Sequence, residues 1–207
     1  MTALSDLQAS FADRLLLNEL LSRHTSARIG GPAEAFLIAR TRADLAQAAR
    51  IAWAHGLPLF ILGGGSNILI SDRGVRGLVV HNSVEAIRVE GATIHADSGA
   101  GTISLARRAA AEGLSGFEWA IGIPGTIGGA AYGNAGAHGG DMAASVARVE
   151  AITPGEGGGI VEAAWTNAEM AFEYRSSILK REPAAPSPPA RRSAACSGTR
   201  PAIMPDA

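Results

Sequence analysis

The stretch from residue 122 to residue 136 most constrains what this chain can fold into. It reads GIPGTIGGAAYGNAG, and glycine recurs too densely in it for the interior of a helix or a strand, because each glycine costs backbone entropy and offers no side chain to pack. Pro124 followed by Gly125 suits a type II turn. No charged residue occurs before Asp141, whereas a solvated linker would be more polar. We therefore expect a bare backbone surface that presents N–H donors to a flat or anionic ligand. The alternative is a buried glycine-rich crossing between two elements.

A second glycine-rich loop follows a continuous apolar run. Residues 57–62 predict a strand buried on both faces, and the strand leads directly into Gly63, Gly64, Gly65, Ser66 and Asn67. Successive N–H groups at a strand end form a concave nest that suits phosphate oxygens. A Walker A loop is excluded because no Lys-Ser or Lys-Thr follows, and because the apolar residues 68–70 predict another strand where a helix should begin. The alternative is a plain glycine hairpin between two strands.

The remaining periodicity predicts alternating short helices and strands up to about residue 182. The expected helices are 5–22, 42–55 with a capping box between Thr41 and Asp44, a helix capped by Thr102 and ended by Gly113, and a turn with a capping box between Thr166 and Glu169. The expected strands are 36–39, 57–62, 78–80, the hairpin 87–90 with 93–96, and 146–153 with 160–161.

One passage imitates a Rossmann fingerprint. Gly99-Ala100-Gly101 stands between an expected strand and an expected helix, but Ser104 occupies the position of the third small residue. The flanking strands also read as an antiparallel hairpin and not as a βαβ unit. We therefore reject a Rossmann-type NAD site here.

Composition excludes several classes of protein. The chain has 207 residues with 47% hydrophobic and 18% charged residues, enough for a sizeable core. A net charge of −1 gives no field that would attract nucleic acid or a membrane surface. The single cysteine, Cys196, allows no internal disulfide, and the five histidines lack metal-ligand spacing, so we expect no metal. No apolar run is long enough to span a membrane, and no signal peptide is evident, so we expect a cytoplasmic protein.

Two separate glycine-rich loops without acidic residues suggest a bound dinucleotide. One loop would cradle the pyrophosphate, and the other would face a flat ring and donate N–H groups to its heteroatoms. Arg175 follows an aromatic residue near the last patterned segment and is a candidate to hold a carboxylate through two hydrogen bonds. The alternative for Arg175 is a solvated surface arginine.

At this point the residues resemble a known family. Four segments are similar to motifs of the bacterial UDP-N-acetylenolpyruvoylglucosamine reductases (also called UDP-N-acetylmuramate dehydrogenases), and their order and spacing agree over about residues 8–180. The segments are 25–33 (TSARIGGPA), 62–69 (LGGGSNIL), 122–136, and the Tyr-Arg-x-Ser motif at 174–177 (YRSS).

The resemblance implies an α+β fold of the vanillyl-alcohol-oxidase-like (PCMH-type) class, with two small α+β subdomains and FAD between them. It also implies a flavoprotein oxidoreductase of peptidoglycan precursor synthesis, and so of cell-wall biogenesis, cell shape and cell division. NADPH would supply a hydride through FAD to the enolpyruvyl double bond of UDP-N-acetylglucosamine enolpyruvate, making UDP-N-acetylmuramate. The expected partners are therefore FAD, NADPH and the UDP-sugar substrate.

The resemblance also assigns roles to individual residues. Arg175 would stabilise the enolate charge that develops beside the substrate carboxylate. The expected FAD-binding residues are Gly63, Gly64, Gly65, Ser66, Asn67, Gly122, Ile123, Pro124, Gly125, Thr126, Gly128, Gly129, Ala130, Gly133 and Asn134.

The end of the chain departs from the family. Residues 183–207 hold six prolines but no apolar period, so we expect a disordered or aberrant tail, such as an out-of-frame reading would produce. The family's proton-donating serine and assisting glutamate belong to a C-terminal substrate domain for which we find no match. The expected division is an N-terminal helix over 1–24, the FAD domain over 25–182, and this tail. The alternative function is a truncated, non-catalytic flavin-binding fragment.

Overall fold

The structure is a computed structural model and describes residues 2–181 and 195–200. Contacts divide these residues into two compact units, each with its own core. The first unit comprises residues 2–83, 152–161 and 195, and the second comprises residues 84–151, 162–181 and 196–200.

The first unit begins with a helix that is shorter than expected. Helix α1 (Ala3–Phe11) is capped by Thr2, and it ends where Ala12 adopts a positive φ of 48°. A 3-10 turn, η1 (Ala12–Arg14), leads into strand β1 (Leu15–Leu20), and η2 (Leu21–His24) follows. The predicted helix over 5–22, and with it the N-terminal helix over 1–24, is therefore wrong beyond residue 11. The leucines of β1 pair antiparallel with strand β2 (Pro32–Ala39), a contact that helical spacing cannot reveal.

A four-stranded sheet forms the centre of this unit, with the strand order β1-β2-β4-β3. Strand β4 (Val75–Asn82) runs parallel to both β2 and β3 (Leu59–Leu62). The apolar run was expected to be buried on both faces, but β3 lies at the edge and its two middle residues are only half-buried. Residues 68–70 form no strand, contrary to the expectation.

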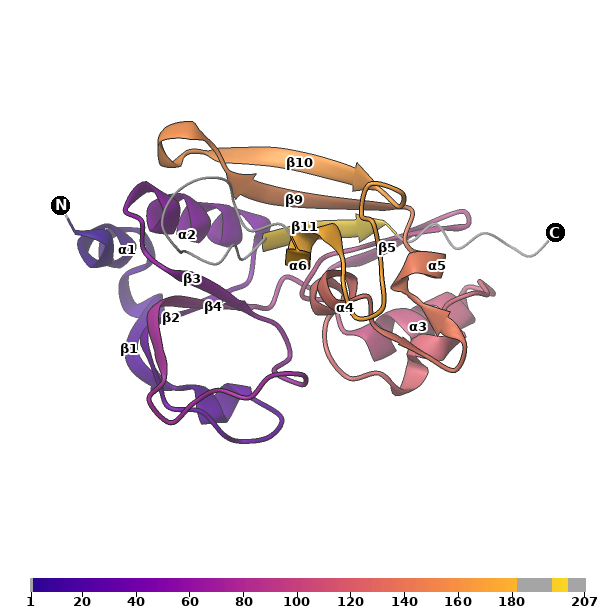
Figure 1. Cartoon of the computed structure of the whole chain (residues 1–207), viewed down its shortest axis with the longest axis horizontal. Helices are drawn as coiled ribbons and strands as arrows, with labels where there is room; N and C mark the ends of the chain where they lie inside the picture. Colours follow the sequence, from indigo (N-terminus) through magenta and orange to yellow (C-terminus); the bar gives the residue numbers. More distant parts are fainter. Residues whose placement is uncertain (1, 182–194, 201–207) are drawn as a thin grey trace. The chain divides into compact units, whose positions relative to one another are not determined.

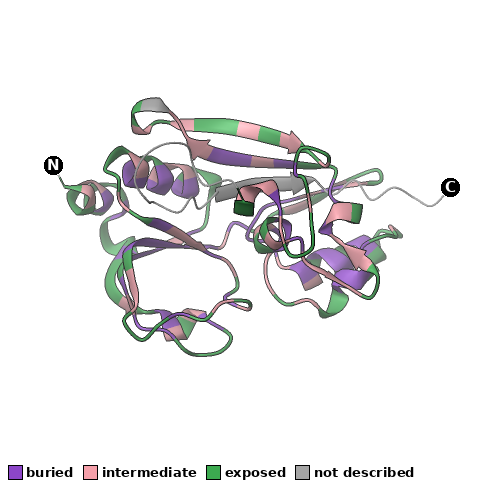
Figure 2. Ribbon diagram, in the orientation of Figure 1, coloured by how far each residue is buried: buried purple, intermediate pink, exposed green. Residues whose placement is uncertain are grey.

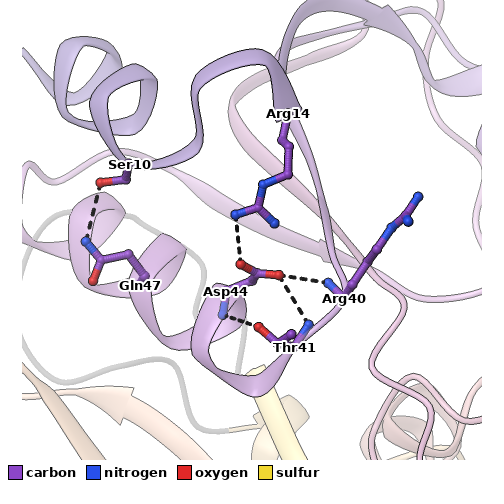
Figure 3. A network of polar contacts seen from close by, with 6 residues as sticks. All are labelled: Ser10, Arg14, Arg40, Thr41, Asp44 and Gln47. Atoms are coloured by element: carbon purple, nitrogen blue, oxygen red, sulfur yellow. Dashed lines mark hydrogen bonds and ion pairs between the residues drawn. The ribbon is translucent and has the colours of Figure 1, made fainter.

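Helix α2 (Arg42–Ala54) packs against this sheet and turns a run of buried residues toward it (Figures 1 and 2). The predicted capping box is confirmed, because Asp44 N donates to Thr41 Oγ1 at 3.0 Å and Asp44 Oδ2 accepts from Thr41 N at 3.2 Å. Arg14 adds an ion pair to the same carboxylate at 3.0 Å (Figure 3). Burial raises the pKa of Asp44, but the hydrogen bonds from Arg14, Arg40 and Thr41 outweigh it and hold the pKa below its usual value.

The second unit starts with the predicted hairpin. Strands β5 (Ile87–Glu90) and β6 (Thr93–Ala96) pair in antiparallel register around Gly91, as expected. Helix α3 (Thr102–Ala111) begins at the expected residue, but Gly101 is its N-cap and makes no side-chain cap. Thr102 is therefore not the cap; its buried hydroxyl donates instead to the carbonyls of Ile123 and Gly125. The shorter elements that follow are η3 (Glu118–Gly122), β7 (Gly136–Ala137), β8 (Gly140–Asp141), α5 (Met142–Ser145) and α6 (Ile178–Arg181).

The glycine-rich stretch contains a helix, contrary to the expectation. Helix α4 (Ile127–Gly133) begins at Thr126, whose hydroxyl accepts from Gly129 N at 3.4 Å. It ends at Asn134, which adopts the left-handed conformation with φ 42° and ψ 62°. Ile127, Ala130 and Ala131 are buried in the core of the second unit, so tertiary packing compensates for the weak helix propensity of glycine.

A five-stranded sheet has the order β10-β9-β11-β6-β5. Strands β9 (Arg148–Pro154) and β10 (Ile160–Thr166) are the predicted pair, joined by the turn η4 (Glu156–Gly158). Thr166 and Glu169 form the predicted reciprocal cap. Strand β11 (Ala195–Arg200) pairs with β6 where Thr199 faces Ala96, so the structure differs from the expected disorder at these residues. The rest of the predicted tail, 183–194 and 201–207, lies outside the described residues.

Candidate functional site

In the first unit, the loop Gly63–Asn67 begins where strand β3 ends. Gly65 has a φ of +63°, and a Cβ atom there would lie 2.2 Å from the carbonyl oxygen of His24. Both the backbone conformation and the close approach therefore require glycine at this position. His24 belongs to η2, so the loop is held directly against the segment that precedes β2.

The loop offers backbone donors. Within the described residues, the N–H groups of residues 64–67 donate to no backbone carbonyl. Ser26 closes one side of the loop, because its N–H donates to Gly65 O at 3.0 Å and its hydroxyl donates to Ser66 Oγ at 3.2 Å. This is the arrangement of a phosphate-binding nest with two hydroxyls at its edge. Ser26 is absent from the predicted site residues, although the motif over 25–33 was the signal that pointed to it.

A small aromatic and ionisable cluster, which we call the His24 cluster, lies beside the loop. It consists of His24, Glu19, Phe36 and His81. The His24 Nε2 atom lies 3.0 Å from Glu19 Oε1, and the His24 ring centroid lies 4.4 Å from that of Phe36 and 5.6 Å from that of His81. His81 Nδ1 is buried, and it is without a hydrogen-bond partner in the described part of the chain. Burial, and then repulsion from His24, lower the pKa of His81.

In the second unit, part of the predicted glycine surface is open. A Cβ atom on Gly122, Gly125 or Gly133 would meet no other atom within 4 Å. Gly125 also has a φ of +122°, which L-residues rarely adopt. Within the segments that the structure describes, the N–H groups of Gly125 and Thr126 donate to no backbone carbonyl, whereas the carbonyl of Gly125 accepts from Thr102 N at 3.1 Å. This surface can therefore accept a flat ligand close to the backbone.

Other glycines of the stretch serve packing. A Cβ atom on Gly128 would lie 2.8 Å from Ser98 Cβ, and Gly128 N donates to Ser98 O at 2.8 Å. Ile127 N likewise donates to Ala100 O at 2.8 Å. The passage over 97–102 therefore lines the glycine stretch, although the sequence was compared there only with a Rossmann site. The Gly-x-Gly at the end of a strand was the sequence signal that could have identified this passage as part of the site.

Asn134 does not present its side chain as an open donor. It is 6% exposed, and its Nδ2 donates to Glu173 O at 3.0 Å while its Oδ1 accepts from Ala143 N at 3.0 Å. The side chain thus joins the end of α4 to the segment that carries Arg175. We describe it as a structural hydrogen-bonding residue.

Arg175 lies at the tip of a tight turn. The backbones of Glu173 and Ser176 exchange two hydrogen bonds of 3.0 Å, and Arg175 has a φ of 55°. Its Nη2 donates to Gly136 O at 3.3 Å, and its guanidinium lies 5.5 Å from the ring centroid of Tyr174. Within the described residues its other donors have no protein partner, which leaves an exposed, permanently charged group available to an anion.

Each surface fits a part of FAD when it is considered by itself. The 63–67 loop presents backbone N–H groups, which are suitable donors for a pyrophosphate, and the open glycines of the second unit leave room for a flat ring. In the described part of the chain, no group of three His, Cys, Asp or Glu residues is placed to hold a metal ion. No helix among the described residues has the length and apolar character to cross a membrane.

Comparisons with known proteins agree with this interpretation. Residues 33–163 match the family described as FAD binding domain. The UDP-N-acetylenolpyruvoylglucosamine reductase of Caldanaerobacter subterraneus subsp. tengcongensis is 42% identical over 170 residues, covering 82% of this chain and 55% of that protein. A second such reductase, from Symbiobacterium thermophilum, is 44% identical over 178 residues, covering 81% of this chain and 54% of its own length. The chain thus spans about half the length of these relatives.

Solved structures show the same fold. The UDP-N-acetylenolpyruvylglucosamine reductase of Thermus caldophilus superposes with a TM-score of 0.67 at 29% identity, over 92% of this chain and 60% of that one. A cholesterol oxidase of Brevibacterium sterolicum superposes with a TM-score of 0.58 at 12% identity, over 91% of this chain and 36% of that one, which supports the fold alone. The predicted α+β, vanillyl-alcohol-oxidase-like (PCMH-type) fold of two small units is confirmed. The chain belongs to the FAD-binding domain family, and its relatives within it are the UDP-N-acetylenolpyruvoylglucosamine reductases.

Proposed function

We propose that this chain binds FAD and takes part in the NADPH-dependent reduction of UDP-N-acetylglucosamine enolpyruvate to UDP-N-acetylmuramate in the cytoplasm. The observation that carries the proposal is the loop at 63–67, whose N–H groups from residue 64 to 67 donate to no backbone carbonyl of the described residues and which contains Gly65, where the carbonyl of His24 leaves no room for a Cβ atom. The identity to named reductases of about 40% supports the substrate class.

The chain's own residues would divide the work between binding and charge stabilisation. The 63–67 loop would donate to the pyrophosphate, and the open backbone at Gly122 and Gly125 would lie against the flavin ring. Bound FAD would supply hydride transfer from NADPH to the enolpyruvyl double bond. Arg175 would hold the substrate carboxylate and stabilise the negative charge that builds up next to it, which a fixed cation does well in a site that excludes water.

A second candidate function is flavin binding without turnover. The family's reaction needs a proton donor. Ser177, the serine of the Tyr-Arg-x-Ser motif, is fully buried. Its hydroxyl already donates to Tyr132 O at 2.8 Å, so its proton is not directed toward a substrate. This observation favours a chain that retains the flavin but lacks the donor.

Flavin retention tests the binding half of the proposal. Gly64→Asp should abolish it, because the new carboxylate would both fill the nest and repel the pyrophosphate. Gly122→Leu should weaken FAD binding at least tenfold, because its side chain enters space that is open in the protein itself. FAD content and dissociation constants are to be measured on the purified chain, together with the melting temperature of the flavin-free protein.

Ala92→Leu is the matched control, because Ala92 is exposed in the β5–β6 turn and belongs to neither glycine-rich stretch. It should leave FAD binding unchanged. Variants at residues 64 and 122 that retain FAD as well as the parent would reject these surfaces as the flavin site.

A further inference from the structure

Two buried side chains form hydrogen bonds that hold the turn carrying Arg175 in place. We propose that Ser177 and Asn134 are positioning residues, which lock the Glu173–Ser176 turn onto the end of helix α4 and thereby fix the place and direction of the Arg175 guanidinium. This inference rests on the proposed function in so far as Arg175 acts on the substrate. The locking itself is a property of this chain and can be measured separately.

The first fastening is Ser177. Its side chain is fully buried, with 0% exposure, and its hydroxyl donates to Tyr132 O at 2.8 Å. Tyr132 lies in the last turn of α4, where carbonyl groups have no partner within the helix. Ser177 therefore satisfies an end carbonyl of α4 and at the same time ties down the residue that follows the turn.

The second fastening is Asn134, on the other side of the turn. Its Nδ2 donates to the carbonyl of Glu173 at 3.0 Å. That carbonyl also accepts from Ser176 N at 3.0 Å, so one acceptor holds both the turn and its anchor. Asn134 is itself fixed, because it ends α4 in the left-handed conformation and accepts from Ala143 N at 3.0 Å.

The exposed tip contrasts with this buried base. Tyr174 is 89% exposed and Arg175 is exposed, whereas Ser177 and Asn134 are buried. A long exposed arginine on a mobile turn would lose rotamer and backbone entropy on meeting an anion. Locking the turn in advance removes part of that loss, which is how a second layer of residues pre-organises a binding group.

The test measures the order of Arg175 and the reaction in parallel. Ser177→Ala removes one fastening, and Asn134→Gly removes the other while keeping a residue that adopts the left-handed conformation at no cost. Ser176→Ala is the matched control, because Ser176 lies in the same turn but its hydroxyl contacts Arg181, at 3.3 Å, and not α4. The first readout is the backbone ¹⁵N order parameter of Arg175 in the FAD-loaded chain.

We expect the order parameter to fall from about 0.85 to below about 0.6 in Ser177→Ala and Asn134→Gly, and to stay unchanged in Ser176→Ala. If Arg175 stays rigid in both variants, the inference is overturned. Should one variant fail to fold, the other decides, because the two fastenings hold opposite sides of the turn.

The second readout is the anaerobic rate at which the enolpyruvyl substrate reoxidises the reduced flavin of the chain. Arg175→Ala should slow this step about 10²- to 10³-fold, the range seen when one charge-stabilising donor is removed. Ser177→Ala should slow it by about tenfold or more, as a misplaced group does. The double variant, with both Arg175→Ala and Ser177→Ala, should be no slower than Arg175→Ala alone, because Ser177 acts through Arg175.

The outcomes separate the inference from the proposed function. An additive double variant would show that Ser177 does not act through Arg175, and it would overturn the inference. If Arg175→Ala leaves the rate unchanged, or if the parent chain gives no reoxidation, the proposed catalytic role fails, and the order parameters alone then decide whether the two residues position the turn.

Discussion

At the scale of single residues, the role of a glycine or a histidine depends on which atoms lie next to it in the fold. Gly65 must be glycine because the carbonyl of His24 is too close for any Cβ atom, and Gly122 is open on the same criterion. His81 carries a buried ring nitrogen without a partner among the described residues, next to His24. We propose that the first two positions shape binding surfaces, and we expect His81 to make the stability of the first unit depend on pH.

The pKa of His81 lies below its ordinary value of 6.5 in the folded protein, so the unfolded chain binds more protons just below this pH. The stabilising effect of the neutral ring is therefore fully present above pH 6.5 and is lost as the pH falls from 6.5 toward the folded pKa. We expect His81→Phe, which keeps a ring next to Phe36 and His24, to reduce the loss of unfolding free energy that accompanies a fall of the pH below 6.5.

Urea unfolding at a series of pH values measures this dependence. The control is His138→Asn, because His138 is exposed in a turn with a φ of 52°, which asparagine tolerates. An identical pH dependence in His81→Phe and in the parent would show that His81 does not cause it.

At the scale of elements, helix α4 is the clearest case of tertiary packing overriding propensity. Its seven residues include three glycines, and its buried face consists of Ile127, Ala130 and Ala131. Two adjacent glycines in it have opposite surroundings. Gly128 packs against Ser98, where an added Cβ would come within 2.9 Å of the carbonyl oxygen, whereas Gly129 is exposed and its Cβ would meet only Thr126 Oγ1 at 3.5 Å.

These surroundings predict opposite effects for the same substitution. Gly128→Ala should destabilise the flavin-free chain by about 1–2 kcal/mol, because the methyl group overpacks against Ser98. Gly129→Ala should stabilise it by about 0.5–1 kcal/mol, because alanine loses less backbone entropy in a helix. Denaturant unfolding of the two variants side by side checks both signs. Equal shifts in the same direction would mean that α4 does not pack on Ser98 as described.

At the scale of the whole molecule, two units with separate cores account for almost all of the described chain. The four-stranded sheet with α2 builds the first unit, and α3, α4 and the β5–β6 hairpin contribute to the core of the second. Strand β11 is the part of the predicted tail that the structure describes, and it pairs with β6 at Thr199 and Ala96.

Deletion of residues 183–207 tests what the tail contributes. Because strand β11 lies between β9 and β6 in the five-stranded sheet, its removal takes away an interior strand, and we expect the melting temperature to fall by several degrees. The comparison is the chain ending at residue 182 against the full chain, by calorimetry at equal concentration. An unchanged melting temperature would show that the pairing of β11 with β6 carries no stability.

Local patterns were sufficient for some elements whose stabilising contacts are close in sequence. The capping box of α2 joins residues three apart, and the β5–β6 hairpin joins strands two residues apart, so the sequence alone predicted both. The motifs together indicated the family, which is confirmed. The binding roles of the 63–67 loop and of the open glycines stay predictions.

Contacts between distant residues decided the rest. Residues 15–20 carry a spacing that fits a helix, but pairing with residues 32–37 makes them a strand, because backbone hydrogen bonds to β2 replace those within a helix. Gly128 is a packing residue because Ser98 lies against it, and Asn134 turns inward because Glu173, 39 residues away, offers its carbonyl. The sequence by itself determined which residues have the chemistry of a flavin site. The tertiary structure alone decided which of them remain free to bind and which hold the others in place, because a hydrogen-bonding group is free only if folding brings no partner to it.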